Sequence, residues 1–297
     1  MAKAQLKPLI VIVGSTAAGK SDLSINLAKK IGGEIVSADS WVIRQELDIG
    51  TAKPTDADMK SVPHHMINII KPCDYYSAAL FKNDANRSID NIYERSSIPI
   101  LVGGTGLYVD AIIYDYSFLP SPSDEQRIEL NALSISELVE LANSRSINIT
   151  TIDQRNKRRL IRAIETNGAV PDKKTLRENT LIIGLSIQKE KLIYRIESRV
   201  DLMLKNGLES EVKNLSEKYG WDCEALKGIG YHEWREFFNS NQSLAETRNR
   251  IIKNTLALSK RQATWFKRNK STHWFSAPVN YAEIDDLVTT FLNKTVY

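Results

Sequence analysis

The sequence has little cysteine and no long apolar run. Its 297 residues include two cysteines, Cys73 and Cys223, which lie far apart and form no Cys-x-x-Cys motif. We therefore expect neither a disulfide framework nor a zinc finger, and a reducing compartment. The first eight residues lack a signal-peptide core, no apolar run could cross a bilayer, and the last five residues lack a cysteine for prenylation. We expect a soluble cytoplasmic protein without membrane contact.

A strong charge of either sign is also missing. The chain has 40 Lys and Arg against 36 Asp and Glu, which gives a formal net charge of +4. This excess is too small to indicate nucleic-acid binding by itself, so the distribution of the charge matters more than its sum. The composition, 42% hydrophobic and 26% charged, is ordinary for a globular protein with a sizeable core.

Short apolar runs alternate with helical patterns along much of the chain. The run at 9–13 is typical of a strand that is buried on both faces, and a helical pattern spans 77–94. Further strand candidates lie at 34–38, 98–102 and 181–185. This alternation predicts an α/β fold with a parallel sheet core flanked by helices.

Residues 117–179 have a different sequence pattern. Pro120 and Pro122 open a stretch with helical signals and no convincing strand. We expect a helical insertion domain here, with the catalytic core formed by 1–116 and 180–297 and helical toward its C-terminal end. Capping-box spacing at Ser134 and Ser243 predicts that helices begin there.

A phosphate-binding loop follows the first strand candidate. The motif GxxxxGK[ST] is matched, between a strand and a helix, by Gly14, Ser15, Thr16, Ala17, Ala18, Gly19, Lys20 and Ser21. The backbone amides and the lysine of such a loop hold phosphate oxygens, and Ser21 can offer its hydroxyl to Mg²⁺. A Gly-rich turn without a ligand is the alternative. The motif is typical of ATP-binding proteins, yet it recognises any diphosphate, including a leaving group.

Two residues at the carboxyl ends of strand candidates have the chemistry of a reaction site. Asp39 follows the second strand candidate and should face the phosphate loop. It could accept a proton from a nucleophile, coordinate Mg²⁺, or simply cap a turn. Thr105 lies in Gly103–Gly106, a glycine-rich strand end where the backbone can approach a ligand.

Basic residues gather in two segments. Residues 260–270 contain five basic residues, two adjacent aromatics and no acid, a combination suited to phosphate contact and base stacking. A second cluster consists of Arg155, Lys157, Arg158, Arg159 and Arg162. Each could instead be a solvated helix face, with Trp265 and Phe266 in the core. His64 and His65 are adjacent and lack further ligand candidates, so we expect a structural or substrate-shaping role rather than a metal site.

These motifs, in this order, resemble the tRNA dimethylallyltransferase (isopentenyl-tRNA transferase) family over nearly the whole chain. The resemblance depends on Gly14–Ser21, Asp39–Ser40, Leu47–Pro54, Pro63–His65, Tyr76–Ala78, Leu101–Tyr108, Arg159–Glu165, Gly228–Tyr231 and Lys260–Phe266. It implies a P-loop NTPase-like core and transfer of a dimethylallyl group from dimethylallyl diphosphate to the exocyclic amine of the adenine 3′ of the anticodon. Diphosphate would leave with the help of Mg²⁺ near Ser21. A monomer that contacts the tRNA anticodon stem-loop is expected.

The same resemblance assigns roles to individual residues. Asp39 is the candidate general base, Thr105 contacts the reacting nucleotide or diphosphate, and the phosphate loop binds the donor. The tRNA-contacting stretches correspond to Asp39, Ser40, Trp41, Val42, Thr105, Arg127, Arg158, Arg159, Leu160, Ile161, Arg162, Lys227, Gly228, Ile229, Gly230, Tyr231, His232, Lys260, Arg261, Gln262, Ala263, Thr264, Trp265, Phe266 and Lys267.

The chain departs from the family pattern in three places. Arg44 stands where a tyrosine is usual, Asn68 replaces a usual aspartate, and the insertion looks shortened before Arg155. These departures concern the substrate shell more than the chemistry. A P-loop kinase of a nucleotide or small metabolite is the main alternative, but it gives no use for residues 260–270. The third hypothesis is a non-catalytic RNA adaptor. The presence of the candidate reaction residues disfavours it: Lys20, Ser21, Asp39 and Thr105.

Overall fold

The structure, a computed structural model, describes residues 7–119 and 124–295. Contacts divide the chain into two units. The larger consists of Met1–Ile113 and Leu176–Tyr297, and the smaller of Tyr114–Thr175. In the part of the chain that the structure describes, no helix combines the length and the apolar character needed to span a bilayer.

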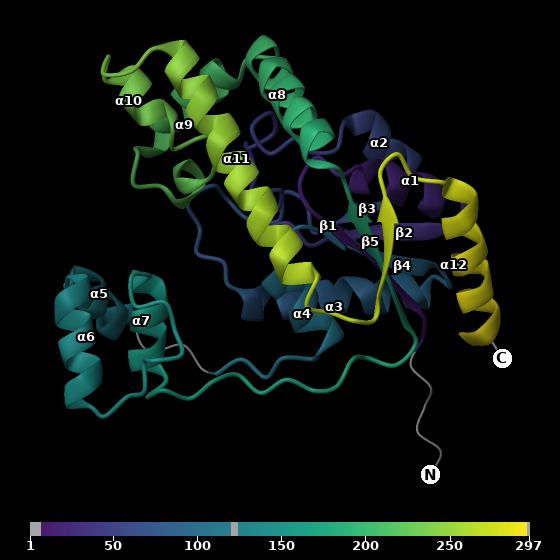
Figure 1. Ribbon diagram of the computed structural model, residues 1–297, viewed down its shortest axis with the longest axis horizontal. Coiled ribbons are helices and arrows are strands. Elements are labelled where there is room, and N and C mark those ends of the chain that lie inside the picture. The colour runs from purple at the N-terminus through teal and green to yellow at the C-terminus, as the bar shows by residue number, and fades with distance from the viewer. Residues whose placement is uncertain (1–6, 120–123, 296–297) are drawn as a thin grey trace. The chain divides into compact units, whose positions relative to one another are not determined.

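A parallel sheet of six strands forms the centre of the larger unit (Figure 1). The strands are β1 (Leu9–Gly14), β2 (Gly33–Ser37), β3 (His64–His65), β4 (Ile98–Gly103), β5 (Thr180–Ser186) and β6 (Thr272–Ser276). Their order is β3-β2-β4-β1-β5-β6, and every neighbouring pair is parallel. The predicted α/β fold class and the four predicted strands are confirmed.

Helices cover this sheet because its central strands are apolar on both faces. The described helices of the larger unit are α1 (Lys20–Ile31), α2 (Asp56–Ser61), α3 (Ala78–Glu94), α4 (Gly106–Ile113), α8 (Lys189–Lys205), α9 (Leu208–Tyr219), the 3-10 helix η1 (Glu224–Lys227), α10 (Trp234–Phe238), α11 (Leu244–Phe266) and α12 (Tyr281–Thr295). Every residue of β1 is buried between β4 and β5. One apolar cluster joins the sheet to Leu23 and Leu27 of α1 and to Ile284 and Val288 of α12.

A second apolar cluster holds the helices α8, α9, α10 and α11 together. Trp234 is fully buried there, among residues that include Val200, Val212 and Ile251. The predicted helix start at Ser243 is confirmed, since its side chain accepts a hydrogen bond from the backbone N–H of Glu246 in a capping box. The long helix α11 packs against α8 and reaches α4 and β1, so it connects this cluster to the sheet (Figure 1).

The smaller unit has a core of its own. Its helices are α5 (Asp124–Ala132), α6 (Ile135–Ser144) and α7 (Lys157–Glu165). Leu138, Ala142, Leu160 and Ile164 are buried among them. The capping box predicted at Ser134 is present at the start of α6. Within the described residues of this unit, the β-type pairing is a single bridge between Ser117 and Asp172.

Two strands of the sheet, β3 and β6, were not predicted from the sequence. The strand β3 has two residues, and β6 has the mixed sequence Thr-His-Trp-Phe-Ser with partly exposed side chains. Both are edge strands, with a neighbouring strand on one side only. An edge strand is less enclosed than a central strand and can carry polar side chains. Neither therefore shows the continuous apolar run by which the central strands were recognised.

The cysteine prediction is wrong. Cys73 and Cys223 form a disulfide with their Cα atoms 4.8 Å apart, although 150 residues separate them in sequence. The fold brings the loop after β3 against the residue that precedes η1, a contact that sequence spacing does not reveal. The argument for a reducing compartment depended on unpaired cysteines and loses its basis.

Candidate active site

The phosphate loop connects β1 to the first turn of α1. Lys20 turns back over the loop, and its ammonium group donates hydrogen bonds to the carbonyls of Gly14 (3.1 Å) and Ser15 (2.8 Å). Burial is the main cause that lowers the pKa of Lys20 to about 8; the carboxylate of Asp39 opposes this shift and Arg199 adds to it. An anion placed on the loop would stabilise the charged form of this lysine.

Two arginines of α8 also reach the phosphate loop, and the sequence reasoning missed both. The Arg195 guanidinium donates a hydrogen bond to the Ala17 carbonyl (3.1 Å), and Arg199 donates one to the Thr16 hydroxyl (3.4 Å). Burial lowers the pKa of Arg199. No carboxylate among residues 7–119 and 124–295 forms an ion pair with Arg199. The nearby Asp22 carboxylate opposes this shift of the pKa without forming an ion pair. A partly buried cation that lacks an ion pair among the described residues, beside a phosphate loop, has the properties of an anion-binding group.

The structure brings Asp39 and Thr105 to one edge of the sheet. Gly103 allows this approach, since a Cβ atom there would lie 2.1 Å from the Ala38 carbonyl oxygen. The Thr105 hydroxyl accepts a hydrogen bond from the Ser40 backbone N–H (3.1 Å) and donates one to the Ser40 hydroxyl (3.3 Å). One oxygen of Asp39 accepts the Trp41 backbone N–H (2.9 Å). Among the described residues, no group donates a hydrogen bond to the other carboxylate oxygen, which leaves that oxygen available to a ligand.

Three cavities meet around Arg199 within the larger unit. The first, about 170 Å³, is lined by the phosphate loop, with Lys20, Ser21, Asp39 and Val42. The second, about 270 Å³, shares Thr16, Asp39 and Arg199 with the first and adds Trp41 and Gly228–Gly230. The third, about 490 Å³, lies against α8 and the loop at 48–56. Asp39 thus borders both the phosphate cavity and its neighbour.

Gln262 of α11 ties the phosphate loop to the glycine-rich strand end. Its side-chain oxygen accepts the Thr16 backbone N–H (2.8 Å), and its amide nitrogen donates to the Gly104 carbonyl (3.1 Å). We expected this residue to face tRNA. The structure gives it contacts that hold two parts of the site together.

The basic segment at the end of α11 presents its charges to solvent. Its exposed residues are Lys260, Arg261, Thr264, Lys267, Arg268 and Lys270, while Ala263 is partly buried. Phe266 is 4% exposed and belongs to the core, so its ring cannot serve as a stacking surface. Trp265 is partly buried; its indole N–H donates to Asp110 (3.1 Å), and the Arg268 guanidinium lies 4.1 Å from the ring centre. The exposed cations of this segment are accessible to a ligand, whereas the Phe266 ring is not.

Residues 227–232 divide between the wall of the second cavity and the interior of the protein. Gly228, Ile229 and Gly230 line it, together with Lys227. Tyr231 is 1% exposed, and its hydroxyl donates to Glu211 (2.8 Å). The ring of His232 points back to the carbonyl of Gly228 (2.9 Å). Direct contact between the Tyr231 ring and RNA is excluded by this burial.

In the smaller unit, the predicted RNA-contacting residues divide into a core set and an exposed set. Leu160 and Ile161 are buried, whereas Arg158 and Arg159 are exposed. The carboxylate of Glu165, whose side chain has no exposed surface, pairs with Arg127 (2.8 Å) and Arg162 (3.1 Å). Arg127 and Arg162 therefore stabilise the unit itself.

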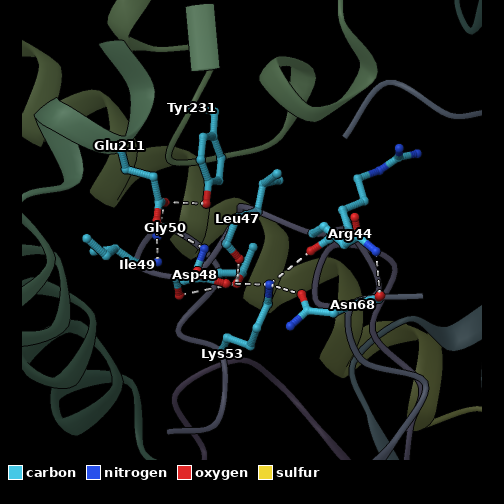
Figure 2. A network of polar contacts seen from close by, with 11 residues as sticks. Arg44, Leu47, Asp48, Ile49, Gly50, Lys53, Asn68, Glu211 and Tyr231 are labelled. Atoms are coloured by element: carbon cyan, nitrogen blue, oxygen red, sulfur yellow. Dashed lines mark hydrogen bonds and ion pairs between the residues drawn. The ribbon is translucent and has the colours of Figure 1, made fainter. Parts of the chain in front are cut away.

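The two unusual residues, Arg44 and Asn68, belong to a polar network (Figure 2). Arg44 is 4% exposed and donates to the carbonyls of Pro72 and Asp74, both at 2.8 Å. Asn68 accepts a hydrogen bond from Lys53 (2.6 Å), which also donates to Asp48 (2.6 Å) and to the Arg44 carbonyl (2.9 Å). The hydrogen bonds of Arg44 and Asn68 therefore connect the loop at 44–53 to the loop at 68–74.

Comparisons with known proteins identify the family of the chain. Residues 43–269 match the family model described as IPP transferase, and residues 7–69 match the one described as isopentenyl transferase. The chain is 39% identical to a tRNA dimethylallyltransferase of Pelotomaculum thermopropionicum, over 94% of this chain and 93% of that protein. It is 37% identical to the one from Bacillus subtilis, over 91% and 90% of the two chains.

Solved structures give the same result. The tRNA isopentenylpyrophosphate transferase from Bacillus halodurans superposes with a TM-score of 0.77 at 34% identity, covering 98% of both chains. A eukaryotic dimethylallyltransferase that acts on tRNA gives a TM-score of 0.75 at 26% identity, over 92% of this chain and 74% of that one. The chain belongs to the tRNA dimethylallyltransferase (IPP transferase) family.

Proposed function

We infer that the chain transfers a dimethylallyl group from dimethylallyl diphosphate to the exocyclic amine of the adenine 3′ of the anticodon in tRNA. The observation that carries this inference is the shared border of the first two cavities. A phosphate loop with Lys20 and Arg199 lies on one side of Asp39, and a second cavity large enough for a flat ring lies on the other. This arrangement suits a reaction between a diphosphate ester and a base.

The donor is held by its diphosphate. Backbone amides of the phosphate loop, the N-terminus of α1 and the two cations Lys20 and Arg199 face the first cavity. Negative charge grows on the diphosphate as the allylic C–O bond breaks, so these groups stabilise the departing anion more than the intact ester. The phosphate loop therefore serves transfer without hydrolysis of a nucleoside triphosphate.

Asp39 is the proton acceptor in this mechanism. As the adenine nitrogen forms its bond to the allylic carbon, the N–H bond breaks and the proton moves to the carboxylate. Thr105, through its bonds to Ser40, fixes the backbone that carries Asp39. A contact from the Thr105 hydroxyl to the nucleotide is part of the proposal, as is extrusion of the adenine from its stack.

The first cavity has donors that fit Mg²⁺. Ser21 and Asp39 both line it, and Mg²⁺ is typically bound through one or two protein oxygens together with substrate phosphates and water. Bound there, it would neutralise charge on the diphosphate. Among the described residues no group of three or more His, Cys, Asp or Glu could hold a metal. The donor's own oxygens would have to complete the coordination.

We propose that tRNA binds through exposed cations rather than through the buried residues of the matching stretches. Lys260, Arg261 and Lys267 lie on the larger unit, and Arg158 and Arg159 on the smaller. Such contacts bind phosphate without reading sequence, and the depth and shape of the second cavity then select an unstacked base.

A labelled-donor experiment tests the function. Purified protein is incubated with tRNA transcript and dimethylallyl diphosphate labelled in the allyl group, and in parallel with ATP labelled in its terminal phosphate. We expect the allyl label to enter RNA and the phosphate label to enter nothing. A transcript in which the adenine 3′ of the anticodon is replaced by guanine is the matched control and should stay unlabelled. Phosphate transfer to a small metabolite, with no prenyl group on RNA, would support the kinase instead.

A further inference from the structure

The Glu211 carboxylate of α9 receives four hydrogen bonds from two separate segments (Figure 2). One oxygen accepts the backbone N–H groups of Asp48 (3.0 Å) and Ile49 (2.8 Å). The other accepts the backbone N–H of Gly50 (3.0 Å) and the hydroxyl of Tyr231 (2.8 Å). Three successive amides that converge on one carboxylate fix the position of a turn closely.

Tyr231 packs directly on this turn. A Cβ atom on Gly50 would lie 2.5 Å from a ring carbon of Tyr231, so the ring and the backbone are in contact and only glycine fits. Burial, followed by the negative charge of Glu211, raises the pKa of Tyr231 well above its ordinary value. The hydroxyl therefore keeps its proton and acts as a donor to Glu211.

Both segments form walls of the second cavity. Gly50 and Thr51 contribute one part of its lining, and Gly228–Gly230 contribute an adjoining part. Thr51 also borders the first cavity and donates its hydroxyl to the Leu47 carbonyl (2.6 Å). Glu211 itself lines none of the three cavities. Glu211 can therefore affect the reaction only indirectly, by fixing the positions of the two segments that line the second cavity.

We propose that Glu211, acting through Tyr231 and the turn at 48–50, is a positioning residue that sets the width of the cavity in which acceptor and donor meet. The proposal rests on the transferase function inferred above. Misplacing a reacting group by about 1 Å can cost about a hundredfold in rate, so a rigid wall has a direct kinetic value. The phosphate-binding groups lie on other segments and do not depend on this carboxylate.

The chain contains a matched control for this contact. Glu46, on the same loop region, accepts hydrogen bonds from Lys218 (2.9 Å) and from the Tyr219 hydroxyl (2.7 Å), both on α9. This contact also joins a carboxylate to a tyrosine between the same loop and helix. Glu46 is 41% exposed and borders none of the three cavities. It should lack an effect on the reaction.

Single-turnover transfer and equilibrium binding test the proposal. Tyr231→Phe removes one hydroxyl, and Glu211→Gln turns an NH₂ group toward backbone N–H donors. We expect the transfer rate constant to fall about tenfold in Tyr231→Phe and about 10- to 100-fold in Glu211→Gln. The Kd values for inorganic diphosphate and for unmodified tRNA should change less than about twofold. Glu46→Gln and Tyr219→Phe should keep the wild-type rate within about twofold.

The possible outcomes are distinct. Wild-type rates in both Tyr231→Phe and Glu211→Gln overturn the positioning role, and so does a loss of diphosphate affinity as large as the loss of rate. The double variant should be no slower than Glu211→Gln, because both changes act on one contact. If Glu211→Gln does not fold, Tyr231→Phe carries the same test. A wild-type protein that prenylates no tRNA refutes the proposed function itself.

Discussion

Arg199 offers the sharpest test of how the diphosphate is held. The Arg199→Gln variant keeps an uncharged, polar side chain near Thr16 but removes a partly buried positive charge close to Lys20. A hydrogen bond to a charged group contributes about 1.5–3 kcal/mol. We therefore expect kcat/KM for the donor to fall about 10- to 150-fold near neutral pH. The wild-type tRNA affinity should be retained.

The pH dependence adds an independent prediction. Lys20 has a pKa of about 8 in the free protein, and the donor needs its charged form. Above that pH, binding the donor requires proton uptake, so kcat/KM for the donor should fall about tenfold per pH unit and level off below it. Arg199 lowers the pKa of Lys20, so Arg199→Gln should move this limb to higher pH.

The assay is prenyl transfer at donor concentrations far below KM, from about pH 6.5 to about pH 9.5, with kcat/KM read from first-order progress curves. Arg248→Gln is the matched control, because it removes an arginine that pairs with Asp201 at the surface of α8 and α11. In that variant, kcat/KM for the donor should equal the wild-type value and should begin to fall at the same pH as in the wild-type protein. An Arg199→Gln protein with unchanged kcat/KM and an unmoved limb would refute the assignment of Arg199 to the donor.

Three further predictions concern the base, the RNA surface and the smaller unit. Asp39→Asn should lower the single-turnover rate about 10²- to 10⁴-fold with an unchanged Kd for diphosphate, and an unaltered rate would reject Asp39 as the proton acceptor. In a variant that neutralises Lys260, Arg261, Lys267 and Arg268, the slope of the logarithm of tRNA affinity against the logarithm of salt concentration should become less steep by about 0.7 per lost phosphate contact. An unchanged slope would make these residues a solvated face. Glu165→Gln should lower the local free energy of opening of α5–α7 by about 1–3 kcal/mol, as measured by hydrogen exchange, because the partly exposed partners Arg127 and Arg162 lose their buried carboxylate. Equal exchange in both proteins would contradict that role.

Much of the fold and part of the site could be predicted because their signals are local. The phosphate loop is a run of eight residues whose backbone conformation follows from its own glycines and neighbours. The apolar runs of β1 and β4 and the capping boxes at Ser134 and Ser243 are likewise readable within a few residues. Asp39 and Thr105 could be placed at one sheet edge because parallel strands end together.

Other site residues gave no comparable signal. Arg195 and Arg199 are spaced to share one face of α8, but an arginine pair at this spacing is common on solvated helices. The stacking pair Trp265 and Phe266 was plausible by composition, and only the packing of α11 shows that one of the rings is buried. The sequence pattern also gave no hint that Gln262 faces the phosphate loop.

The amino-acid sequence by itself determined the phosphate loop, the alternation of strands and helices, and the carboxylate at the end of the second predicted strand. These depend on backbone conformation and apolar periodicity, which neighbouring residues set. Only the tertiary structure decided which helix faces meet the sheet edge, and with them the contacts of Arg199, Glu211 and Gln262 and the bond between Cys73 and Cys223. Such contacts join residues far apart in the chain, and they exist only when the apolar clusters beneath α8, α9 and α11 bring those helices together.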